Sequence, residues 1–113
     1  MIAEELKELA LTSLEDMKGQ DIVCLDVKGM TSVCDYMLVV TGTSSRHLKS
    51  LTDELAKRVK QAGALVYGME GQESMDWILV DLGDVVIHAM LSATRELYDL
   101  EALWSITAER QAE

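Results

Sequence analysis

The stretch that decides the fold is WILVDLGDVVIHAM, residues 77–90, in which two apolar runs flank a Leu-Gly pair. This pattern predicts a β-hairpin with Trp77 opposite His88 and Asp81 opposite Asp84. Side chains alternate across a strand, so one face of the hairpin collects only aliphatic residues. They are Ile78, Val80, Val85, Ile87 and Ala89. We expect this face to lie in the core.

The opposite face of the hairpin mixes aromatic, aliphatic and charged groups. It carries Met75, Trp77, Leu79, Asp81, Asp84, Val86, His88 and Met90. This face is too apolar for an ordinary solvent-facing sheet and too polar for a sealed core, a composition typical of a protein-binding patch. The interpretation depends on the register, because a one-residue slip would redistribute the faces.

A second interpretation of the hairpin concerns Asp81, Asp84 and His88. Two carboxylates and one imidazole could bind a divalent metal or act as an acid–base set. Acidic residues are also common at hairpin corners without such a role, and no further ligand group is evident in the sequence. We therefore predict neither a metal nor a cofactor, and an enzyme remains the alternative.

Two amphipathic segments precede the hairpin. In residues 2–17 apolar side chains recur every three or four positions, which predicts a helix that Gly19 caps. The segment TGTSSRHLKSLTDELAKRVKQAG, residues 41–63, predicts a second helix, with Thr43, Ser44 or Ser45 as N-cap and Gly63 as terminator. Its apolar stripe is formed by Leu48, Leu51, Leu55, Val59 and Ala62.

The remaining segments complete the predicted fold. Residues 22–27 and 35–42 are short apolar runs that predict two adjacent strands, and residues 64–67 predict a third short strand. Residues 68–76 are expected to form a loop, and residues 92–100 a last short helix. The order helix, strand, strand, helix, strand, strand, strand, helix predicts an α+β domain with helices packed on a mixed sheet. We place this single domain at residues 1–105, followed by a polar tail at residues 106–113.

Composition limits the partners. The 113 residues carry a formal charge of −10, and the basic residues form no run. Such a charge repels phosphates and attracts a basic protein, so we predict little direct nucleic-acid contact.

The sequence lacks the roughly 18 uninterrupted apolar residues of a membrane span and the basic start of a signal peptide, so we expect a cytoplasmic protein without membrane contact. Cys24 and Cys34 lack CxxC spacing and are expected to be reduced and buried.

Two further motifs have competing interpretations. TGTSSRH, residues 41–47, has the shape of an anion-binding helix start, but helix capping already explains its Ser and Thr residues. Arg46 and His47 are expected on an exposed first turn.

RELYDLEALW, residues 95–104, holds Arg95, Tyr98 and Trp104, which are residue types of interface hot spots. The alternative is that its apolar residues simply cover the sheet.

Four motifs follow one another along the chain: LDVKGMTSVCDYMLVVTGTSSRHLKSL, MEG, DWILVDLGDVVIHAM and RELYDLEALW. In this order they resemble the ribosomal silencing factor family, also called RsfS or Iojap, and the resemblance spans residues 2–104. It implies a nucleotidyltransferase-like fold without enzymatic activity. The sequence lacks the carboxylates that true nucleotidyltransferases carry on a strand after the Gly-Ser/Thr turn. Asp53 and Glu54 do not replace them, because they lie within the second predicted helix.

The resemblance also implies a function through contact. Members bind the large ribosomal subunit at its protein fourteen and block joining of the small subunit, which represses translation under nutrient limitation. They can form homodimers when free, and organellar relatives take part in large-subunit assembly. For this chain, the resemblance and the face analysis together predict ten partner-binding residues: Met69, Glu70, Trp77, Asp81, Asp84, His88, Arg95, Tyr98, Leu103 and Trp104.

Overall fold

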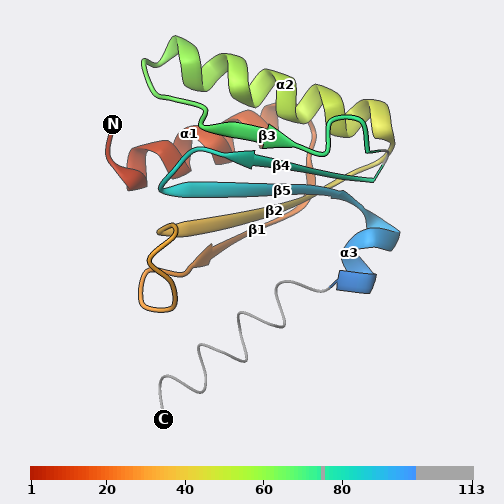
Figure 1. Ribbon diagram of the computed structural model, residues 1–113. Coiled ribbons are helices and arrows are strands. Elements are labelled where there is room, and N and C mark those ends of the chain that lie inside the picture. The colour runs from red at the N-terminus through yellow and green to blue at the C-terminus, as the bar shows by residue number, and fades with distance from the viewer. Residues whose placement is uncertain (75, 99–113) are drawn as a thin grey trace.

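The computed structural model of the chain describes residues 1–74 and 76–98. In that part of the chain a mixed five-stranded sheet is combined with three helices (Figure 1). The elements are α1 (Ala3–Asp16), β1 (Gln20–Asp26), β2 (Tyr36–Gly42), α2 (Ser45–Gln61), β3 (Gly68–Glu70), β4 (Trp77–Asp81), β5 (Val85–Leu91) and α3 (Ser92–Tyr98). The predicted α+β class and the predicted order of elements are confirmed.

The sheet has the strand order β1-β2-β5-β4-β3. Only the central pair, β2 and β5, is parallel, whereas the other neighbours are antiparallel. All seven residues of β2 are buried, because this strand has a neighbour on each side and is covered on both faces. None of the helices in the described residues is long and apolar enough to cross a membrane.

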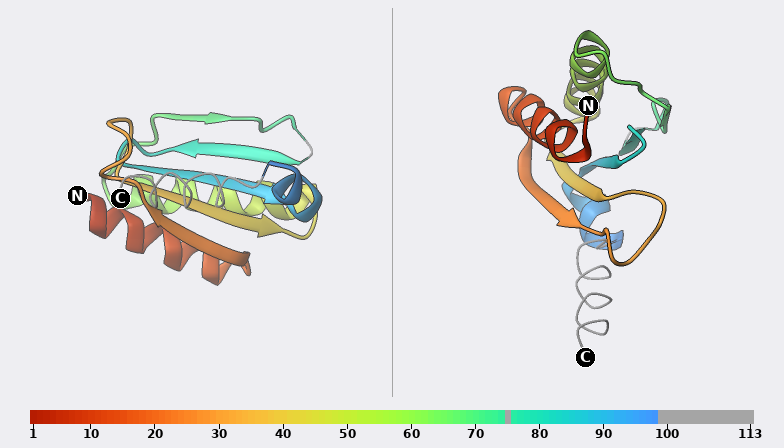
Figure 2. Two further views of the ribbon diagram at one scale, coloured as in Figure 1. Left: turned by 90° about the horizontal axis from the view of Figure 1, so that it is seen from below. Right: turned by 90° about the vertical axis from the view of Figure 1, so that its left-hand side faces the viewer.

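The two long helices cover the same face of the sheet (Figure 2). Neither of them covers the other face, which we call the open face with respect to residues 1–74 and 76–98. The main core lies between α1, α2 and the sheet and includes Leu14, Leu38, Leu51 and Ile87. On the open face, residues of the β1–β2 connection cover only a smaller cluster. It consists of Val27, Cys34, Met37, Val39 and Met90. The candidate site described below lies on the rest of this face, within the described part of the chain.

The hairpin of β4 and β5 forms with a register different from the predicted one. Asp81 pairs with Val86 and not with Asp84, and the Leu82 N–H donates to the Val85 carbonyl over 2.9 Å. The two-residue turn is therefore Gly83-Asp84, in which Gly83 has a φ of +87° that suits the first position of a type II′ turn. The difference from the predicted pairing is two residues, which is one full pleat, so the side chains of β4 and β5 stay on their predicted faces. Met75, also predicted on the mixed face, lies outside the described residues. The aliphatic face is buried as predicted.

The prediction of a strand at residues 64–67 is wrong. The third strand is β3, which lies within the segment expected to be a loop. Gly68 pairs with Asp81, the last residue of β4, and the Tyr67 N–H donates to the Asp81 carbonyl over 2.8 Å, so residues 64–66 run past the end of that strand. The alternating pattern of 64–67 has another cause: Ala64 and Val66 pack on the core, whereas Leu65 and Tyr67 are exposed.

Both long helices end in the same way. At the end of α1, Lys18 adopts a φ of +62°, and the Gly19 N–H donates to the Leu14 carbonyl over 2.8 Å. This is a Schellman motif with Lys18, and not the predicted Gly19, in the left-handed position. Gly19 is required by space instead, since a Cβ there would lie 2.6 Å from Val40 Cγ2. At the end of α2, Gly63 takes the left-handed position as predicted, with a φ of +85°.

Two predicted burials differ in the structure. Ala62 follows α2 as its C-cap and is exposed, so it does not belong to the apolar stripe. Cys24 is exposed because it lies on β1, an edge strand of the sheet. Cys34 is buried as expected, and burial raises the pKa of its thiol.

Candidate docking surface

Trp77 is the first residue of β4 and lies half-buried on the open face. Its indole Nε1–H donates to Nδ1 of His88 over 3.0 Å, and the two ring centroids are 5.7 Å apart. His88 is opposite Leu79 on the neighbouring strand, so the two rings meet diagonally across the hairpin. The hydrogen bond fixes the direction in which the indole faces solvent.

His88 is buried beside Trp77, with 8% of its surface exposed, so its ring is not presented to a partner as a partner-binding residue would be. Cover from Trp77 and the neighbouring strands removes this ring from solvent. Burial lowers the pKa of His88, and Nδ1 must be unprotonated to accept the indole proton. His88 is thus a neutral residue that positions Trp77.

Tyr98 extends the aromatic surface from the end of α3. Its ring centroid lies 4.9 Å from that of Trp77, and 53% of the residue is exposed. Two side-chain hydrogen bonds hold α3 in place: Thr94 Oγ1 donates to Asp76 Oδ2 over 3.2 Å, and Arg95 Nη1 donates to Thr41 Oγ1 over 2.8 Å. Arg95 was predicted to contact a partner, and the structure places it in this internal contact between α3 and β2.

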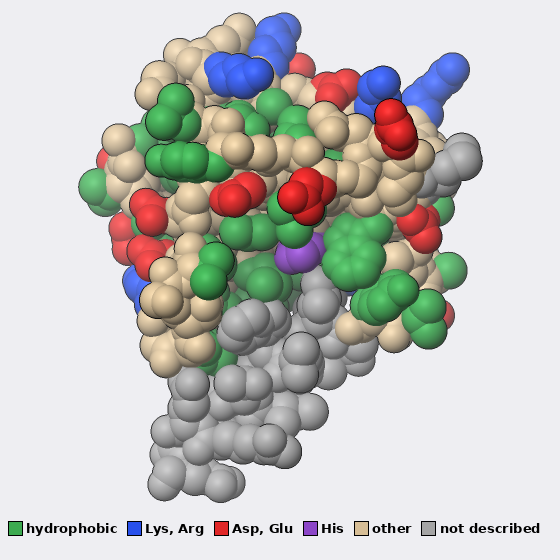
Figure 3. Space-filling model, in the orientation of Figure 1, with side chains coloured by type: hydrophobic (Ala, Val, Ile, Leu, Met, Phe, Trp, Pro, Cys, Tyr) green, Lys and Arg blue, Asp and Glu red, His purple; other side chains and the backbone are tan. Residues whose placement is uncertain are grey.

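A groove of about 430 Å³ lies beside these two rings. Its lining combines apolar side chains with carboxylates: Glu70, Gly71, Ser74, Asp76, Trp77, Leu79 and Tyr98. We refer to these seven residues as the docking surface. Acidic and hydrophobic side chains lie next to each other on the face of the molecule shown in Figure 3. The surface thus offers flat apolar contacts bordered by negative charge.

The segment before β4 gives the groove its shape. The Ser74 hydroxyl donates to Asp76 Oδ1 over 2.6 Å and accepts the backbone N–H groups of Asp76 and Trp77. Gly71 has a φ of +83°, and a Cβ at this position would clash with the Trp77 carbonyl. Ser74, Asp76 and Gly71 were missed by the sequence analysis, although Gly and Ser-x-Asp between two strands are turn signals.

The other predicted partner-binding residues do not all lie at the groove. Glu70, on β3, is opposite Leu79 of β4 and lines the groove, and its contact with a partner stays a prediction. Met69 is opposite Val80 and packs against the main core, so its predicted place on the open face is wrong. Strand alternation explains this, because neighbours in a strand face opposite sides. Leu103 and Trp104, and the domain boundary at residue 105, lie outside the described residues.

The two hairpin aspartates have structural contacts at the turn. Asp81 Oδ1 accepts the Gly83 N–H over 2.8 Å, and the Asp84 carbonyl accepts the N–H groups of Asp35 and Tyr36. Asp84 itself is exposed. Among residues 1–74 and 76–98, no group of three or more His, Cys, Asp or Glu side chains is placed to hold a metal ion. The geometry therefore gives no support to the metal-binding alternative.

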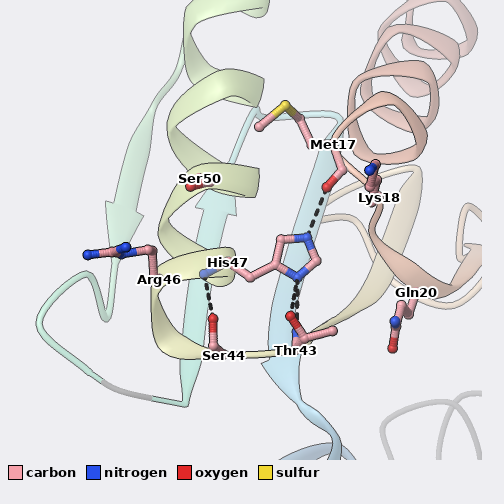
Figure 4. A pocket seen from close by; sticks show the side chains of 8 residues that line it. All are labelled: Met17, Lys18, Gln20, Thr43, Ser44, Arg46, His47 and Ser50. Carbon is pink, nitrogen blue, oxygen red and sulfur yellow. Dashed lines mark hydrogen bonds between the residues drawn. The ribbon is translucent and has the colours of Figure 1, made fainter.

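The TGTSSRH segment forms a second hollow, of about 440 Å³, between the end of α1 and the start of α2 (Figure 4). Ser44 is the N-cap, and its side chain accepts the His47 N–H. His47 was expected to be exposed, but its ring bridges two elements: Nδ1 accepts the Thr43 N–H and Nε2 donates to the Met17 carbonyl, each over 2.9 Å. These contacts give the segment a role in joining α1, β2 and α2.

The amino-acid sequence of the chain is similar to those of known proteins. The family model described as "Ribosomal silencing factor during starvation" matches residues 2–113. A ribosomal silencing factor RsfS from Chromobacterium violaceum is 48% identical over 104 residues, covering 92% of this chain and 85% of that protein. The mouse protein named "Mitochondrial assembly of ribosomal large subunit protein 1" is 34% identical over 102 residues, covering 88% of this chain and 45% of that protein.

A solved structure agrees with these matches. The crystal structure of a Chromobacterium violaceum protein, 48% identical, superposes with a TM-score of 0.90, covering 93% of this chain and 88% of the other. On sequence and fold together, the chain belongs to the ribosomal silencing factor family, RsfS.

Proposed function

We propose that the docking surface binds protein fourteen of the large ribosomal subunit, and that the bound chain prevents the small subunit from joining. Family membership supports a ribosomal partner. The observation that carries the proposal is the half-exposed pair of Trp77 and Tyr98 beside a groove with carboxylates. Aromatic anchors with a polar rim are characteristic of protein-binding sites.

The residues of this surface have different tasks in the proposed complex. Trp77 and Tyr98 supply flat apolar area at a low cost in side-chain entropy. Glu70 on the docking surface and Asp81 at the neighbouring end of β4 face basic side chains of the ribosomal protein. A chain with a charge of −10 is also drawn toward a basic partner, which raises the rate of encounter.

Repression in this proposal needs occupancy and no chemistry. A folded body on the joining face of the large subunit excludes the small subunit by its volume. The extent of repression then follows the fraction of large subunits that carry the protein. We infer accordingly that the chain acts in the cytoplasm, that it represses translation when nutrients are limited, and that it is not an enzyme.

The test is a subunit-joining assay with purified subunits, followed by gradient sedimentation. Adding the wild-type chain should reduce the 70S peak, whereas Glu70→Lys should restore joining, because a reversed charge opposes a basic partner. Glu70 is exposed on an edge strand, so this variant should keep its fold.

The matched control is Leu65→Ala, which removes an exposed apolar side chain, 65% accessible, away from the docking surface. It should block joining as well as the wild type does. Unchanged joining with the wild-type chain, together with no binding to the large subunit, would disprove the proposal.

A second candidate function is assembly of the large subunit. The observation that favours it is the relative in mouse whose name refers to assembly of the mitochondrial large subunit. Both functions would use the same docking surface. Precursor particles that accumulate in a strain lacking this gene, with normal joining of mature subunits, would favour assembly over repression.

We also propose that the free chain forms a homodimer that competes with the ribosome. The exposed aromatic and aliphatic side chains of α3, Tyr98 and Leu97, support a second use of this end of the molecule. Sedimentation equilibrium of the free chain should give a mass that increases with concentration. A monomer at all concentrations up to about 100 times the dissociation constant for the ribosome would contradict it.

A further inference from the structure

The outer side of α2 carries a stripe of basic residues. Arg46, Lys49, Lys57 and Lys60 are all exposed, and their spacing of three, eight and three residues keeps them on one side of the helix. Asp53, also exposed, lies midway along the stripe. From first to last cation the stripe extends about 21 Å at 1.5 Å per residue. We call these four cations the basic stripe.

The basic stripe is positively charged, although the chain as a whole is negatively charged. Five of the ten basic residues belong to α2, against two acidic residues there, although the whole chain has a charge of −10. Arg58, the fifth, is used internally: it forms ion pairs with Asp16 and Glu54 at 2.7 and 2.8 Å. Within residues 1–74 and 76–98, no member of the basic stripe forms an ion pair.

The basic stripe and the docking surface are separate surfaces. The apolar side of α2 packs on one face of the sheet, and the docking surface lies on the other. On the face shown in Figure 3, the Lys and Arg side chains lie mainly along the upper edge, where α2 runs, with some acidic side chains among them. A partner on the docking surface therefore leaves the basic stripe accessible.

We infer that the basic stripe binds the phosphate backbone of an RNA helix next to the docked protein, an inference whose setting rests on the proposed function. A protein partner is disfavoured because interfaces are built around aromatic and apolar anchors and are depleted in lysine. The apolar residues of α2, such as Leu51 and Leu55, are fully buried against the sheet and cannot insert into a lipid surface. Separate cations along a rod fit regularly spaced phosphates.

The total charge does not prevent this contact. At physiological salt the screening length is about 8 Å, so a phosphate at the stripe is affected mainly by the nearest charges. The acidic docking surface on the other face of the sheet acts on it weakly. The prediction of little nucleic-acid contact then holds for the rest of the surface, and the outer side of α2 is the exception.

The test measures binding to a fluorescently labelled mixed-sequence RNA duplex, and binding to the large ribosomal subunit, at several salt concentrations. We compare the wild type with the variant Arg46→Gln, Lys49→Gln, Lys57→Gln and Lys60→Gln. Each lost phosphate contact should lower the slope of log affinity against log salt by about one. We expect the variant to lose duplex binding and to bind the subunit with a shallower salt dependence than the wild type.

Thr12→Glu with Ser32→Glu, compared with Lys49→Gln with Lys57→Gln, controls for net charge. Both double variants lower the charge by two, but Thr12 and Ser32 are exposed residues outside α2. Only the α2 double variant should weaken duplex binding. Equal loss in both, or wild-type binding to phosphatidylserine vesicles or polyglutamate in place of the duplex, would overturn the inference. If the wild type fails to bind the subunit at all, the proposed function fails instead, whatever the duplex shows.

Discussion

At the scale of single residues, His88 decides how Trp77 is presented. The imidazole is buried, and its Nδ1 accepts the indole N–H over 3.0 Å. A buried neutral base with a fixed hydrogen bond restricts the rotation of the indole, so the ring is oriented before a partner arrives. Such preorganisation lowers the entropy cost of binding.

His88 should make folding stability depend on pH. Burial lowers its pKa in the folded state from the ordinary 6.5, so the unfolded chain binds more protons below that pH. Its contribution is fully present above about pH 6.5 and is lost as pH falls toward the lowered value, by up to about 1.4 kcal/mol per pH unit. Urea unfolding at pH 7.5, 6.5 and 5.5 measures this, with His88→Asn as the non-titrating reference. Identical pH profiles for both proteins would contradict the assignment.

Gly71 should be the least replaceable glycine near the groove. Gly71→Ala places a Cβ against the Trp77 carbonyl at a φ of +83°, and we expect it to lower the free energy of unfolding by about 1–3 kcal/mol. Gly68→Ala is the matched control, since a Cβ there has no neighbour within 4 Å, and should change stability by less than about 0.5 kcal/mol. Equal melting temperatures for the two variants would refute this account.

At the scale of elements, the sequence predicted where both long helices end, but it assigned the cap of α1 to Gly19 and not to Lys18. The apolar periodicity and Gly63 predicted α2, and Ser44, one of the three predicted N-cap candidates, caps it. For α1 the glycine next to the end suggested a glycine cap, although Gly19 is there to make room for Val40. A glycine in the sequence does not reveal which of these two constraints applies.

Opposite substitutions at the two left-handed positions should have opposite effects. Lys18→Gly relieves a φ of +62° and should raise the free energy of unfolding by about 0.5–1 kcal/mol, after subtracting the greater freedom of glycine in the unfolded chain. Gly63→Ala imposes that strain at a φ of +85° in open space and should cost about 1 kcal/mol. Thermal unfolding measures both. A loss of stability in Lys18→Gly would show that its side chain matters more than its backbone.

At the scale of the whole molecule, the residues that stabilise the fold and the residues proposed to contact a partner lie on opposite faces of the sheet. The residues that hold α1 and α2 on the sheet are buried on one face, while the other face is only partly covered. Hydrogen bonds from Thr94 and Arg95 attach α3 beside the open part. Under the proposed function, truncation of exposed side chains on the docking surface, such as Tyr98, should change binding with little effect on the main core.

Two neighbouring residues of α3 test this separation. Tyr98→Ala should weaken binding to isolated large-subunit protein fourteen by about tenfold, because Tyr98 contacts Trp77 and is 53% exposed. Leu97→Ala is the control, since Leu97 is 76% exposed and lies outside the groove lining, and should leave the affinity within about twofold. Isothermal titration calorimetry measures both affinities. A greater loss in Leu97→Ala than in Tyr98→Ala would place the docking surface elsewhere on α3.

The sequence by itself determined the α+β class, the element order, both long helices and the division of the hairpin into an aliphatic and a mixed face. These features depend on periodicity and on turn residues, which act over a few positions. Only the tertiary structure decided that β5 lies beside β2, that Met69 faces the core, that His88 is buried under Trp77, and that Asp76 and Tyr98 meet at one groove. Those outcomes depend on which distant segments pack together, and the packing free energy that selects them is a property of the whole chain.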